Sequence, residues 1–121
     1  MGELTVNFIT FDEPRDACLM VLVEGPWAGP TEGHLRALQD RMYACLEAAL
    51  DGQLTGQFPD ARGKTVVVRL DCYDLPREEV DAFVSRFSTG VSNMTDFDTE
   101  ASPYVSAFRF EVNHDSLSAE S

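Results

Sequence analysis

Short runs of residues that are apolar, or that alternate between apolar and polar, predict four β-strands. These runs span residues 4–10, 17–24, 65–73 and 104–113. The 17–24 run is almost continuously apolar, as expected of a central strand that is covered on both faces. Side chains alternate across a strand, so in 65–73 the valine-rich face is opposed by a face that carries Arg69 and Asp71.

Apolar residues that recur every three or four positions predict two helices. The longer helix starts at Thr31, a typical N-cap residue, and is closed by Gly52. The second starts at Asp74-Leu75-Pro76, because proline is accepted in the first helical turn, and ends at Gly90. Residues 53–64 and 91–103 are expected to form loops.

The order β-β-α-β-α-β predicts an α+β fold in a single domain of residues 1–121, with a polar tail at 115–121. We expect a two-layer sandwich: a mostly antiparallel sheet with two helices packed on one face. The first two strands are joined by a short polar turn, which favours a hairpin. The helical connections also permit parallel neighbours, and the pattern does not specify the strand order.

The composition predicts a soluble protein with its own hydrophobic core. The chain has 121 residues, of which 44% are hydrophobic, and no apolar run approaches the length of a membrane span. The N-terminus lacks the basic and apolar regions of a signal peptide, so we expect a cytoplasmic location. Cys18, Cys45 and Cys72 each lie in an apolar pattern without a paired cysteine, which predicts buried, reduced thiols and no zinc site.

The chain is strongly acidic: 21 carboxylates against nine Lys and Arg residues give a net charge of -12. This charge disfavours nucleic acid and anionic membranes and favours a basic protein partner. Most of the excess falls in two clusters near and after the second helix. The clusters are Asp71, Asp74, Glu78, Glu79 and Asp81, and then Asp96, Asp98 and Glu100. The helix dipole accounts for Glu78 and Glu79, and for the rest an interaction surface and simple solubility both stay open.

Other candidate residues have a structural interpretation beside a functional one. Trp27, alone in a Gly/Pro loop, either anchors an interface or covers the end of the core. His34 and His114 are expected to be solvated. Residues 96–100 are similar to the opening of a calcium loop, but Ala101 stands where glycine is required. No phosphate-binding, hydrolase or metalloprotease motif occurs, so we expect neither an enzyme nor a metal or cofactor.

The middle of the chain, from Cys18 to Phe87, resembles a small uncharacterised family of bacterial domains. The matching segments are His34-Leu35-Arg36-Ala37-Leu38-Gln39, Tyr43, Gly52-Gln53-Leu54, Pro59-Asp60-Ala61-Arg62-Gly63 and Val66-Val67-Val68. Members of this family are similar to the small acidic partners found beside secreted bacterial toxins. The resemblance implies a fold and an association with toxins, and it carries no catalytic residues.

Three hypotheses follow. The leading one is a cytoplasmic immunity protein that neutralises a cognate toxin by occluding its basic active site. The carboxylates of both clusters would bind the toxin, with Trp27 as an apolar anchor. The second is a small-molecule or metal-dependent enzyme or sensor whose site includes Trp27, His34 and Cys45. The third is a regulatory module that forms a homodimer through a sheet edge.

Overall fold

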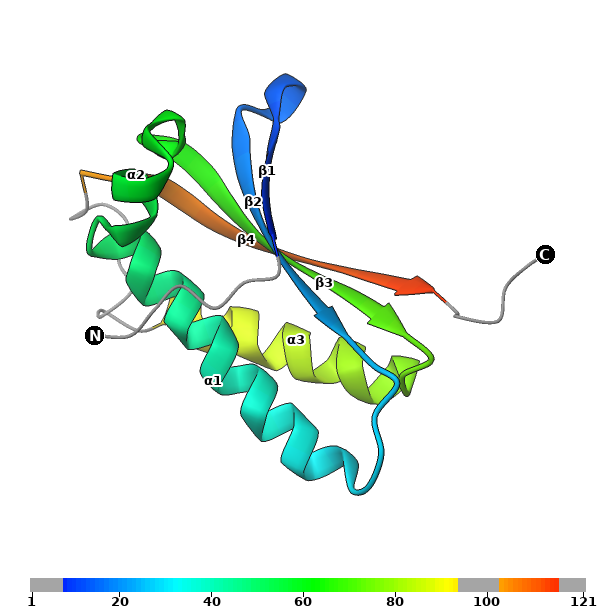
Figure 1. Ribbon diagram of the computed structural model, residues 1–121. Coiled ribbons are helices and arrows are strands. Elements are labelled where there is room, and N and C mark those ends of the chain that lie inside the picture. Colours follow the sequence, from blue (N-terminus) through cyan, green and yellow to red (C-terminus); the bar gives the residue numbers. More distant parts are fainter. Residues whose placement is uncertain (1–7, 94–102, 116–121) are drawn as a thin grey trace.

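The computed structural model describes residues 8–93 and 103–115. Its elements confirm the predicted α+β class (Figure 1). In order they are β1 (Phe8–Asp12), the 3₁₀ turn η1 (Glu13–Arg15), β2 (Ala17–Glu24), α1 (Thr31–Leu50), α2 (Gln53–Gln57), the 3₁₀ turn η2 (Pro59–Ala61), β3 (Lys64–Tyr73), α3 (Arg77–Ser92) and β4 (Val105–Asp115).

The four strands form one sheet in the order β1-β2-β3-β4. The β1–β2 pair is antiparallel, which confirms the predicted hairpin, but β2–β3 and β3–β4 are parallel. The prediction of a mostly antiparallel sheet is therefore wrong, and the sheet is mixed. The physical reason is that each helical connection carries the chain back to the end of the sheet at which the previous strand began.

Both long helices cover the same face of the sheet, as predicted (Figure 1). The connections β2–α1–β3 and β3–α3–β4 step in the same direction along the sheet. Such connections are right-handed in nearly all proteins, so two steps in one direction place both helices on one side. The opposite face carries no helix among the described residues; we call it the open face.

The main core lies between the helices and the sheet. Alternate residues of β2 and β3 point into it, and the valine-rich face of β3 is buried as predicted. Fully buried residues from both layers include Met20, Leu22, Val66, Leu70, Leu38, Met42 and Leu46. Phe83 and Phe87 of α3 complete the core against β4.

Several element boundaries differ from those predicted, and residues 4–7 of the first predicted strand lie outside the described residues. Thr31 is the first residue of α1 and Pro30 occupies the N-cap, with no side-chain hydrogen bond. α3 continues past Gly90 to Ser92. The predicted loop 53–64 contains α2 and η2, because Leu54 and Ala61 are fully buried and hold this connection on the core.

Candidate functional site

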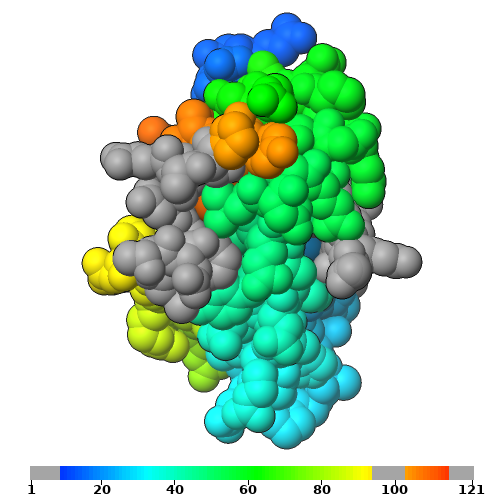
Figure 2. Space-filling model, turned by 90° about the vertical axis from the view of Figure 1, so that its left-hand side faces the viewer, coloured from blue at the N-terminus to red at the C-terminus, as the bar shows by residue number. Residues whose placement is uncertain are grey.

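Exposed carboxylates gather where α1 and α3 begin. Glu78 and Glu79 lie in the first turn of α3, where the helix dipole stabilises them. They border a hollow of about 370 Å³ between the two helices, which we call the helix groove. Its lining residues are Thr31, Glu32, Leu35, Glu78, Glu79, Ala82 and Arg86. Figure 2, which views the molecule from the side on which both helices end, shows α1 (cyan to green) next to α3 (yellow-green).

The groove has an apolar floor and a rim of three carboxylates with one arginine, Arg86. Glu32 brings a third carboxylate from α1, and Leu35 and Ala82 supply apolar surface. Among the described residues, neither Glu78 nor Glu79 is ion-paired, and Glu32 has one highly exposed pair with Arg36 at 3.6 Å. Such an exposed pair is weak, so the three carboxylates are available to a partner.

Asp71 is engaged within the protein. On the open face it accepts hydrogen bonds from Arg69 Nε at 3.0 Å, Arg69 Nη2 at 3.2 Å and Asn113 Nδ2 at 3.1 Å. Its side chain is 14% exposed. The prediction that Arg69 and Asp71 lie on one face of the strand is confirmed. The two side chains form an ion pair, which lies apart from the helix groove.

Asp81 links α3 to the last strand. Its carboxylate lies 2.8 Å from Nε2 of His114 on β4. The His114 side chain is only 10% exposed, so the expectation of a solvated histidine is wrong for this residue. The reason is that β4 runs to Asp115, two residues beyond its predicted end, which keeps His114 on the sheet beside α3.

Of the remaining predicted carboxylates that the structure describes, Asp74 does not line the helix groove. Asp74 follows β3 with a positive φ of 58° and is exposed. Asp96, Asp98 and Glu100 lie outside the described residues. The first cluster is thus divided between the helix groove and internal contacts.

Trp27 holds its own loop against α1. Its indole Nε1 donates a hydrogen bond to Glu24 at 2.9 Å, and its ring stacks on His34 with centroids 5.0 Å apart and planes 6° from parallel. Glu24 also pairs with Arg41 of α1. Glu24 was not predicted as a site residue, although a carboxylate at the end of an apolar strand is a signal for such a pair.

The structure brings together two of the three residues of the alternative enzyme or sensor site. His34 stacks on Trp27, but Cys45 lies about 16 Å further along the axis of α1, at about 1.5 Å per residue. Cys45 is fully buried, and burial raises the pKa of its thiol to about 12. The thiol is therefore protonated at neutral pH, which argues against a nucleophilic role.

All three cysteines should resist thiol reagents in the folded protein. Burial raises the pKa of Cys18 to about 11 and that of Cys72 to about 12. At pH 8 we expect the native chain to react with a disulfide reagent about 100-fold more slowly than the denatured chain, because the thiolate is the reacting form. A Ser85→Cys variant, with its thiol on the exposed side of α3, is the control and should react at once. A native thiol that reacts as fast as this introduced one would contradict the prediction.

Among residues 8–93 and 103–115, no three His, Cys, Asp or Glu side chains are grouped in a way that could hold a metal ion. In the same residues no helix combines the length and the apolar character that crossing a membrane requires. Comparison with protein-family models, curated proteins and solved structures found no match to the chain. The resemblance to toxin-associated domains therefore stays a prediction.

Proposed function

We propose that this chain is a cytoplasmic immunity protein that binds a cognate toxin and occludes the toxin's basic active site. Carboxylates would take the place of the phosphates that such a site binds, since both accept charge-assisted hydrogen bonds from arginine and lysine. The protein would act by binding, without catalysis, metal or cofactor.

The observation that supports this proposal best is the helix groove. Glu32, Glu78 and Glu79 meet there over an apolar floor, which is the combination a protein interface needs. Elsewhere, within the described residues, four of the nine basic residues form ion pairs with carboxylates of the same chain. The surplus negative charge is thus left for a partner.

The other predicted residues have different parts in this proposal. Asp74, Asp96, Asp98 and Glu100 remain proposed partner contacts that add to the attraction. Asp71 and Asp81 form contacts within the fold, with Arg69 on the open face and with His114 on β4. Trp27 orders the loop that precedes α1, and its half-buried ring contributes apolar surface. Pairing of two copies through an outer strand, β1 or β4, stays a separate prediction.

The test is co-expression with toxin-like products of neighbouring genes, followed by purification of the complex and stopped-flow measurement of association. Reversing two groove charges, with Glu78→Lys and Glu79→Lys together, should slow association by about tenfold or more at low salt, because complementary charge mainly raises the on-rate. The loss should shrink as salt screens the charges.

The matched control is Glu13→Lys with Asp60→Lys. It changes the net charge equally, and it uses two exposed carboxylates in η1 and η2, at the other end of the sheet. This control should retain most of the association rate. Equal slowing by both double variants would show that only net charge matters, and it would exclude the helix groove as the binding site.

A further inference from the structure

The open face of the sheet has a hydrophobic centre although no described helix covers it. Ala17, Leu19, Val21 and Val67 form a second buried apolar cluster there, with Val23 packed against it. These residues alternate with those that face the helices, and Leu19 lies beside Val67 in the parallel register of β2 and β3. β2 is therefore apolar on both faces, and β3 adds Val67 to the apolar centre of the open face.

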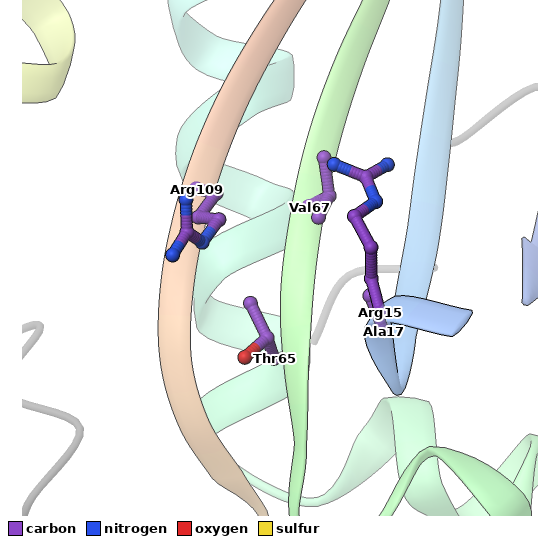
Figure 3. A pocket seen from close by; sticks show the side chains of 5 residues that line it. All are labelled: Arg15, Ala17, Thr65, Val67 and Arg109. Atoms are coloured by element: carbon purple, nitrogen blue, oxygen red, sulfur yellow. The ribbon is translucent and has the colours of Figure 1, made fainter. Parts of the chain in front are cut away.

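A hollow of about 280 Å³ adjoins this centre on the open face. It is lined by Arg15, Ala17, Thr65, Val67 and Arg109. Figure 3 shows Arg15 and Arg109 on opposite sides of Thr65 and Val67. The strand register explains the grouping, because Ala17 pairs with Thr65 and Val67 pairs with Arg109. At about 30 Å³ per water molecule, the hollow has room for a ligand of about eight or nine non-hydrogen atoms.

The charge of this lining is opposite to that of the chain. Residues 8–93 and 103–115 contain 16 carboxylates and nine basic residues, yet both charged residues that line the hollow are arginines. Two carboxylates form ion pairs with Arg15. Asp12 pairs with Nε of Arg15 at 2.6 Å, and Glu111 pairs with Nη1 of Arg15. Within the described residues, Arg109 has no ion pair, and its side chain is exposed.

We propose that this hollow binds a small aliphatic monocarboxylate. The carboxylate pairs with the guanidinium of Arg109, whose planar fork suits carboxylate geometry, and accepts a hydrogen bond from the Thr65 hydroxyl. The aliphatic body lies against the methyl group of Thr65 and the methylene groups of the two arginines, above the buried Ala17 and Val67. A single anionic group fits best, because Arg15 is already paired with Asp12 and Glu111, which would repel a second one. The site is on the face opposite the helix groove, so its occupancy is independent of the proposed toxin binding.

The test is an NMR titration of the full chain with sodium hexanoate, followed through the backbone amides of β3 and β4. We expect saturable shifts at Thr65, Val67 and Arg109, with a Kd on the order of 1 mM for a ligand of this size. Acetate, which lacks the apolar body, and 1-hexanol, which lacks the charge, should each bind at least about tenfold more weakly. Equal binding of acetate and hexanoate, or no saturable shift, would overturn the proposal.

Two arginine variants test which residue holds the ligand. Arg109→Gln should weaken hexanoate binding about tenfold, because it removes the charge that pairs with the carboxylate. Arg77→Gln removes another exposed arginine, at the start of α3, and should leave the affinity unchanged. Equal effects of the two variants, or an unchanged affinity in Arg109→Gln, would overturn the proposal. Thr65→Val keeps the side-chain shape and should weaken binding a few-fold, which gives a second check that does not depend on altering Arg109.

Discussion

Replacing Phe87 with alanine is expected to lower the free energy of unfolding by about 3–5 kcal/mol. The Phe87 side chain is 6% exposed. Its ring centroid lies 4.8 Å from that of Tyr43 on α1 and 5.4 Å from that of Phe110 on β4. Because three elements meet at this ring, none can move to fill the cavity without disturbing the other two. Urea denaturation followed by circular dichroism measures the loss.

The control for this substitution is Ser85→Ala, on the exposed side of the same helix, which should change stability by no more than about 0.5 kcal/mol. If Phe87→Ala does not fold, Phe87→Leu retains more of the volume and should lose about 1 kcal/mol. A loss below about 1 kcal/mol for Phe87→Ala would show that the α1–α3–β4 junction is not packed as described.

Gly25→Ala is expected to lower the free energy of unfolding by about 2–4 kcal/mol, from backbone strain and overpacking together. Gly25 has a φ of +104°, and a Cβ atom there would lie 2.3 Å from the carbonyl oxygen of Tyr73 and 2.8 Å from Cδ2 of Leu75. The loop after β2 and the loop after β3 would have to separate. Since Glu24 precedes this glycine, the hydrogen bond from Trp27 would also be disturbed.

Gly29→Ala is the matched control in the same loop. Its φ of +87° is also positive, but nothing lies within 4 Å of an added Cβ atom, so only backbone strain of about 1–2 kcal/mol is expected. Urea denaturation measures both losses, and the fluorescence of the single tryptophan reports the loop directly. Equal losses in the two variants would mean that the close approach of Gly25 to Tyr73 contributes nothing to stability.

The candidate site shows where prediction from sequence stops. The acidic first turn of α3 was predicted with Glu78 and Glu79, because charge near a helix start is a local feature. Glu32 was not, since it reaches the groove only through the packing of α1 beside α3. Asp71 and Asp81 were predicted as partner contacts, and in the fold they pair with Arg69 and His114.

The fold also combines features that the sequence predicts with features that arise only from tertiary contacts. The approximate positions of the four strands and of the two long helices followed from periodicity, because alternation in a strand and the helical repeat are properties of neighbouring residues. Parallel pairing of β2, β3 and β4 did not follow, since it depends on where each helix returns the chain. The arginine-lined hollow on the open face likewise exists only because η1 and β4, far apart in the sequence, flank β3 in space. Local patterns thus specify the elements and their charge, whereas contacts between distant segments settle which charges remain available for binding.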